Sequence, residues 1–281
     1  MHQKEGKASF GHIYDLEDPR EYYRTLGGMD YRAPEHGQRL FSSLIEKRRN
    51  GGGPVNVVDL CCSYGVNAAL LKYDVDLDDL YERYSSDNLP PTGEGLAEAD
   101  LEYYAGHEKA AAPRVVGVDV ADNAVSYALE AGLLDAGAVE DLENGPPSEG
   151  LRREVSDADL FTVTGGIGYI SERTFDRLLG CVEDGRGPWV AVLALRWVSY
   201  DRISEVLDRY GLVTEKLEGH TFEQRRFADE AEREYVCGEL GRMGIDTEGK
   251  EREGSYHAEF YLSRPADQTS KTGVEELVNL G

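Results

Sequence analysis

The chain has 281 residues, of which 40% are hydrophobic, enough for one large domain with a buried core. Its formal net charge is −24 at pH 7, so its surface repels phosphate backbones and a nucleic-acid substrate is disfavoured. No apolar run approaches the roughly 18 residues of a membrane span, and the polar start lacks the apolar stretch of a signal peptide, so we expect a soluble, cytoplasmic protein without a membrane partner.

The first part of the chain is rich in tyrosine and charge. Between positions 34 and 48, Leu40, Phe41, Leu44 and Ile45 recur at helical spacing, which predicts a helix. Asn50-Gly51-Gly52-Gly53-Pro54 then breaks the chain. We therefore expect a helical cover or lid at 1–54, a main domain at 55–264 and a polar tail at 265–281.

Strands and helices alternate through the main domain. The predicted strands are 55–60, 114–120, 138–142, 159–164, 189–196, 212–217 and 256–263. The first predicted helix begins near 66, and the others cover 123–134, 172–182 and 200–210. This alternation predicts an α/β fold, a mostly parallel sheet with helices on both faces. The last strand alternates apolar and polar residues, which favours an antiparallel edge strand.

Two stretches exceed this minimal unit. Residues 74–113 lie between the first helix and the second strand, and residues 219–254 lie between the last two strands. The first is acidic and carries tyrosines, whereas the second is largely charged with a helical pattern. Insertions of this length are usually lids or caps, so we expect both to cover a site.

The segment from Val57 to Asn67 is the most informative one. An apolar strand ends at Asp59, and a tight turn leads directly into a helix. Such a turn offers backbone N–H groups and a helix N-terminus to a nucleotide-like ligand. Turns of this kind usually carry several glycines, but here Gly65 alone remains, and Cys61 and Ser63 occupy the other positions.

In element order, the chain resembles class I S-adenosylmethionine (SAM)-dependent methyltransferases over about residues 55–264. The glycine loop of that family corresponds to 59–65, and its ribose-binding acid corresponds to Asp119, at the end of the second strand. The acid that contacts adenine corresponds to Asp141, and the loop that faces the methyl group follows Thr164. A nicotinamide-binding Rossmann domain would need Gly-x-Gly-x-x-Gly, which this loop does not supply.

The resemblance implies SAM as the cofactor and a Rossmann-like methyltransferase sheet with an antiparallel last strand. It implies that the cofactor is bound by Asp59, Cys61, Ser63, Tyr64, Gly65, Asn67, Asp119, Val120, Asn123, Asp141, Leu142, Thr164 and Gly165. Within the loop, the Ser63 hydroxyl is expected near the methionine carboxylate and the Tyr64 ring near the sulfonium. Aromatic faces attract such a cation.

Three residues are candidates for catalysis. Tyr169 follows the fourth strand, and Tyr23 belongs to the tyrosine-rich cover. A hydroxyl acceptor would need a general base, for which His220, after the sixth strand, is the preferred histidine. The cysteines, Cys61, Cys62, Cys181 and Cys237, show no zinc spacing, so we expect reduced thiols and no metal.

The favoured activity is methyl transfer to a small molecule. The family members that methylate nucleobases or glutamine amides carry Asn/Asp-Pro-Pro-Tyr after the fourth strand, where this chain has Gly165-Gly166-Ile167-Gly168. An alternative is cyclisation of SAM itself to azetidine-2-carboxylate or 1-aminocyclopropane-1-carboxylate, with release of methylthioadenosine. Non-catalytic SAM binding is a third possibility, and no feature of the sequence marks an oligomeric interface.

Overall fold

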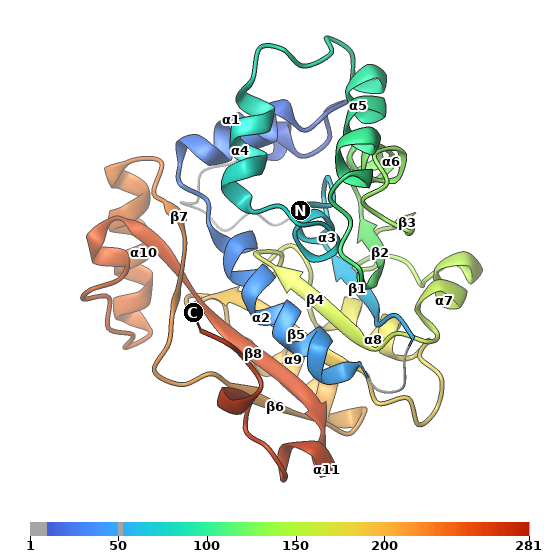
Figure 1. The fold of residues 1–281 in the computed structure, drawn as a ribbon. Helices are drawn as coiled ribbons and strands as arrows, with labels where there is room; N and C mark the ends of the chain where they lie inside the picture. The colour runs from blue at the N-terminus through green and yellow to red at the C-terminus, as the bar shows by residue number, and fades with distance from the viewer. Residues whose placement is uncertain (1–9, 50–52, 281) are drawn as a thin grey trace.

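The computed structural model describes residues 10–49 and 53–280, and within them the chain forms one eight-stranded mixed sheet (Figure 1). The strands are β1 (Asn56–Leu60), β2 (Arg114–Asp119), β3 (Ala136–Val139), β4 (Leu160–Thr164), β5 (Trp189–Leu195), β6 (Leu212–Lys216), β7 (Phe222–Arg226) and β8 (Ser255–Pro265). Their order is β3-β2-β1-β4-β5-β8-β6, with β7 also paired to β8.

Strands β1 to β5 run parallel, and β8 runs antiparallel to β5, β6 and β7. The predicted mostly parallel α/β sheet with an antiparallel last strand is therefore confirmed. The expected edge position of that strand is wrong, because β8 lies between β5 on one side and β6 and β7 on the other. β8 is long enough to pair with both of those shorter strands along one side.

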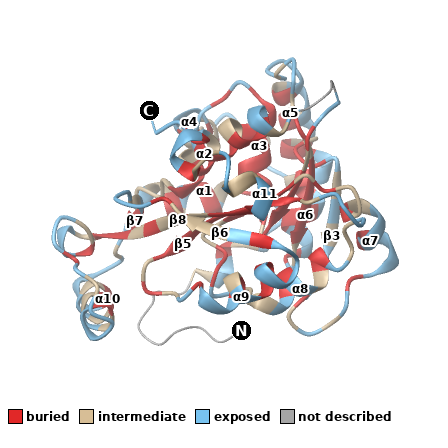
Figure 2. Ribbon diagram, turned by 90° about the horizontal axis from the view of Figure 1, so that it is seen from below, coloured by how far each residue is buried: buried red, intermediate tan, exposed pale blue. Residues whose placement is uncertain are grey.

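The helices are α1 (Arg20–Gly28), α2 (Ala33–Arg48), α3 (Val66–Lys72), α4 (Leu77–Ser85), α5 (Gly93–Ala105), α6 (Asp122–Glu130), α7 (Glu149–Val155), α8 (Glu172–Leu179), α9 (Asp201–Arg209), α10 (Glu230–Arg242) and α11 (Ala266–Thr269). Apolar residues of α2, α3 and α6 form one core with the sheet, and those of α7, α8 and α9 form a second. Figure 2 shows the central strands largely buried between these layers. Covered on both faces, β5 is buried at every position.

The predicted insertions are partly helical. Residues 74–113 contain α4 and α5, and α4 begins with a capping box made by Asp76 and Asp79. Residues 219–254 contain α10, as their charged helical pattern indicates, but also β7, which that pattern does not reveal. The sequence Phe-Glu-Gln-Arg-Arg of β7 has no alternation of apolar and polar residues that would have marked a strand.

The two ends of the described chain differ from the expectation. α2 packs against α3 and β4 as part of the main core. Within 1–54, therefore, only the part before α2 resembles a cover. Positions 1–9 and 50–52 lie outside the described residues. The tail after 265 is not merely polar, because Val274, Leu277 and Val278 are buried in the same core. None of the described helices is long and apolar enough to cross a membrane.

Candidate functional site

The carboxyl ends of the parallel strands bring the predicted acids together. β1 pairs with β2 on one side and with β4 on the other, so Asp59, Asp119 and Thr164 all lie toward one edge of the sheet. The loop after β1 also lies at this edge, where Cys61 N–H donates to the Val118 carbonyl at 2.8 Å. In open α/β sheets this edge is where ligands bind.

The loop keeps the backbone of a glycine-rich turn although two glycines are replaced. Cys61, Ser63 and Gly65 have φ angles of 56°, 47° and 74°, all in the left-handed region that favours glycine. For cysteine and serine this conformation costs on the order of 1–2 kcal/mol per residue. The Cys61 thiol fills the space beside Gly166, where an added Cβ would lie 2.8 Å from the sulfur.

Replacing Ser63 with glycine is expected to raise the free energy of unfolding by about 1 kcal/mol. Glycine adopts this φ without strain, and the change also removes a buried hydroxyl that has no hydrogen-bond partner among the described residues. Denaturant unfolding measures the effect. Ser126→Gly, on the exposed side of α6, is the control and should lose about 0.5 kcal/mol. A destabilised Ser63→Gly variant would contradict the assignment of strain.

Asp59 is the centre of a buried polar network. Its Oδ1 accepts hydrogen bonds from Thr162 Oγ1 at 2.7 Å and from Asn67 Nδ2 at 3.0 Å, and Asn67 also donates to Thr164. Its Oδ2 is buried and has no partner in the described parts of the chain. Burial raises the pKa of Asp59 to about 6, since the charged form is poorly solvated. A cationic group placed at Oδ2 would therefore favour the ionised carboxylate.

The carboxylate of Asp119 is oriented by the backbone. It accepts from Ser63 N–H at 2.8 Å, from Val120 N–H at 2.7 Å and from Ala121 N–H at 3.1 Å. A carboxylate has about four acceptor positions. One position therefore remains for a ligand hydroxyl, and a second hydroxyl would have to share an oxygen with, or displace, one of these amides.

The other predicted cofactor residues lie along the same edge. Val120 is 48% exposed directly after Asp119, which leaves an apolar side chain free to contact a ligand. Asn123, at the start of α6, binds Asp15 through both its backbone N–H and its side-chain amide. Asp141 is exposed and closes a turn onto the Asn144 amide, which lowers the pKa of its carboxyl, and Leu142 is buried.

Two predicted tyrosines are packed inside the protein. Tyr64 is 1% exposed, and its hydroxyl donates to the Leu16 carbonyl at 3.0 Å, so its ring anchors the N-terminal segment and is not open to a sulfonium. Tyr23 is buried and stacks on Tyr84 with ring centroids 4.2 Å apart. This packing does not favour the catalytic role expected for Tyr23 or the ring position expected for Tyr64, and both stay predictions.

His220 is exposed in the connection between β6 and β7. β7 begins two residues later and pairs with β8 on the same side as β6. The role of His220 as a general base stays a prediction.

Tyr169 lies beyond β4 and is joined there by Tyr14 and Tyr31, two tyrosines of the N-terminal segment expected to cover the site, and by Arg225, which the sequence did not single out. Burial raises the pKa of the Tyr14 hydroxyl, and the neighbouring Tyr169 raises it further, whereas Arg225 lowers it. Burial likewise raises the pKa of the Tyr31 hydroxyl, which has Tyr169 and Arg225 among its neighbours. A Cβ added at Gly165 would lie 3.2 Å from the Tyr31 hydroxyl. Tyrosines from the N-terminal segment and an arginine from β7 thus gather beside the end of β4.

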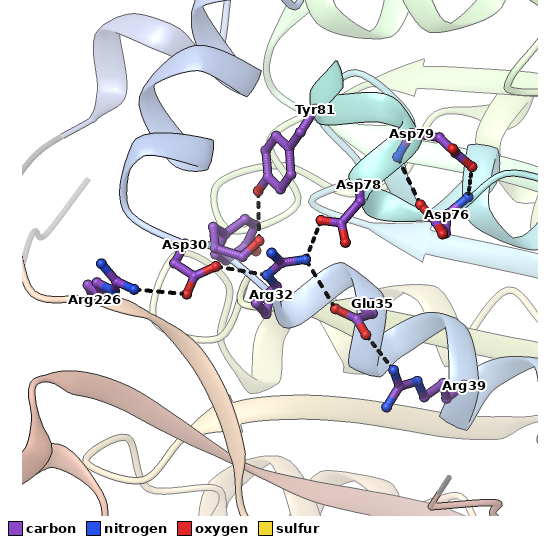
Figure 3. Close-up of polar contacts among 10 residues, drawn as sticks. Asp30, Arg32, Glu35, Arg39, Asp76, Asp78, Asp79, Tyr81 and Arg226 are labelled. Atoms are coloured by element: carbon purple, nitrogen blue, oxygen red, sulfur yellow. Dashed lines mark hydrogen bonds and ion pairs between the residues drawn. The ribbon is translucent and has the colours of Figure 1, made fainter. Parts of the chain in front are cut away.

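Polar contacts hold the covering segments together (Figure 3). Arg32, just before α2, donates to Asp78 of α4 at 2.6 Å, and Tyr81 of α4 donates to the Tyr31 carbonyl at 2.7 Å. The Arg32 N–H also donates to the Gln224 carbonyl of β7 at 2.7 Å. The exposed ion pair contributes little by itself, but together these contacts join both insertions to the segment that carries Tyr31.

No protein-family model and no curated protein matches the chain. Among solved structures, a TehB-like SAM-dependent methyltransferase from Corynebacterium glutamicum is 15% identical, covering 78% of this chain and 85% of its own, with a TM-score of 0.38. The plantazolicin methyltransferase BpumL in complex with S-adenosylhomocysteine (SAH) is 9% identical, covering 88% and 90%, with a TM-score of 0.43. The [4+2]-cyclase SpnF is 13% identical, covering 80% and 79%, with a TM-score of 0.38. These likenesses assign neither substrate nor activity to this chain.

Proposed function

We propose that the protein is a SAM-dependent methyltransferase that acts on a small molecule. The supporting observation is the loop after β1, which keeps left-handed backbone at Cys61, Ser63 and Gly65 although only one of them is glycine. Strained backbone of this kind persists mainly at functional sites, where the surrounding structure holds it. The end of β1 and the loop after it hold two buried atoms without partners among the described residues, Asp59 Oδ2 and Ser63 Oγ.

These orphaned atoms fit the two charged groups of the methionine part of SAM. The Ser63 hydroxyl can donate to a carboxylate, and Asp59 Oδ2 can accept from an ammonium group. Asp119 would bind the ribose through its remaining acceptor position, with Val120 against the adenine. The acid Asp141 and the buried Leu142 would border the same base at the end of β3.

The chain's own groups would then bind and shield the cofactor. When bound, SAM supplies a methyl group on a positively charged sulfur. The rings of Tyr14, Tyr31 and Tyr169 would attract that charge through their faces and exclude water from the reacting atoms. Because the N-terminal segment and both insertions cover this edge of the sheet, the proposed acceptor is a small molecule.

Product analysis tests the proposal. The purified protein should bind SAM in calorimetry and release SAH only when an acceptor is added from a panel of small hydroxyl and amino compounds. Methylthioadenosine formed from SAM alone would instead support cyclisation of the cofactor and overturn methyl transfer. Absence of SAM binding would overturn both activities, whereas binding without either nucleoside product across the panel would favour a non-catalytic role.

A further inference from the structure

β7 contains an irregularity that turns two neighbouring side chains inward. Glu223 pairs with His257 and Arg225 pairs with Tyr256, so Gln224 is an extra residue in the ladder with β8. Side chains of a regular strand alternate between faces, yet Gln224 and Arg225 are 5% and 3% exposed. Such β-bulges commonly re-aim a side chain beside an active site.

On the side away from β8, backbone hydrogen bonds join the bulge to the segment before α2. The Gln224 carbonyl accepts from the Arg32 N–H at 2.7 Å, and Arg226 N–H donates to the Met29 carbonyl at 2.8 Å. The neighbouring guanidinium of Arg225 binds both carboxylate oxygens of Glu232, at 2.8 and 3.0 Å, so its charge is neutralised inside the fold. The Gln224 side chain is thus placed by its backbone, and the Arg225 guanidinium beside it on β7 is already paired with Glu232.

The carboxamide of Gln224 lies at the end of β4. A Cβ added at Gly165 would lie 2.9 Å from its Nε2 and 3.2 Å from the Tyr31 hydroxyl. Its Oε1 is buried and accepts no hydrogen bond from any described residue. A buried amide oxygen usually has a donor, so its lack of one at this position indicates a ligand group.

We propose that Gln224 recognises the acceptor by taking a hydrogen bond from its O–H or N–H group through Oε1. The proposal rests on the proposed methyl transfer and specifies its substrate class as a neutral small ring compound with such a donor. The neutral class follows from the two arginines of β7, whose residues are all described. Arg225 is paired with Glu232 and Arg226 with Asp30, so neither is an unpaired cation for an anionic group. The ring follows from the phenol rings of Tyr14, Tyr31 and Tyr169, against which a flat group packs well.

Phenol and anisole are the probes, because they differ in the single O–H donor. Ligand-observed NMR titration of the SAH-loaded wild-type protein should show phenol binding several-fold more tightly than anisole. Gln224→Leu should weaken phenol binding about tenfold and leave anisole binding and SAH binding unchanged. Its melting temperature should not fall, because the substitution removes an unpaired buried amide oxygen.

Gln38→Leu is the matched control. The Gln38 amide is satisfied by the carbonyls of Leu70 and Val75, so this variant should lose stability and retain the preference for phenol. If the wild type binds SAH normally but binds phenol and anisole equally well, the role assigned to Gln224 is overturned. The proposed function is not affected by that result. Undiminished phenol binding by Gln224→Leu would overturn the role of Gln224 as well. Failure of the wild type to bind SAH would instead overturn the proposed function on which it rests.

Discussion

Replacing Asp119 with alanine is expected to weaken SAM binding by more than tenfold. The substitution removes the proposed charge-assisted hydrogen bond to the ribose, and a tenfold loss corresponds to about 1.4 kcal/mol. It also removes the acceptor for Ser63 N–H at 2.8 Å, which positions the loop after β1. Both effects act on the cofactor site, so the loss should exceed that of a single neutral hydrogen bond.

Isothermal titration calorimetry with SAM measures the change, and denaturant unfolding confirms that the variant is folded. Asp119→Asn keeps one acceptor oxygen and should lose less affinity than alanine. Asp122→Ala is the matched control, because this neighbouring acid is exposed in the first turn of α6 and should leave SAM affinity close to the wild-type value. If Asp119→Ala binds SAM as tightly as the wild type, Asp119 is not the ribose acid.

Replacing Asp100 with alanine is expected to lower the free energy of unfolding by about 3–5 kcal/mol. Asp100 is 0% exposed on α5 and accepts from Arg83 Nε at 2.8 Å, from Tyr127 at 2.6 Å and from the Tyr84 hydroxyl. Without the carboxylate, a partly buried guanidinium and two phenol hydroxyls lose their acceptor. The network joins α4 and α5, the helices of the first insertion, to α6. The ring of Tyr23 stacks on that of Tyr84, which belongs to the network.

Denaturant unfolding monitored by circular dichroism gives the free energies. Asp87→Ala is the control, since Asp87 is exposed in the same insertion and its replacement should change stability by less than about 0.5 kcal/mol. A loss below about 1 kcal/mol for Asp100→Ala would mean that the network does not hold the insertion in place. The SAM affinity of Asp100→Ala, compared with that of the wild type, then measures whether the packing of residues 74–113 contributes to the proposed cofactor site.

The order of strands and helices could be predicted because it depends on local patterns. Apolar runs such as Val57 to Leu60 indicate buried parallel strands, and the acids Asp59 and Asp119 end two of them. Parallel strands that pair directly place their carboxyl ends at one edge, so the meeting of these acids followed from the pattern alone. The antiparallel last strand followed from its alternation, but its place inside the sheet did not, because alternation does not specify neighbours.

Local patterns therefore specified the sheet and the position of the loop after β1 within it. Which side chains reach that loop depends on tertiary contacts. The Tyr64 side chain points toward the N-terminal segment, because its hydroxyl donates to the Leu16 carbonyl, 48 residues earlier in the chain. Gln224 reaches Gly165 because one extra residue in β7 shifts the alternation of its side chains. Such contacts depend on how distant segments cross and share hydrogen bonds, for which neither composition nor periodicity is a signal.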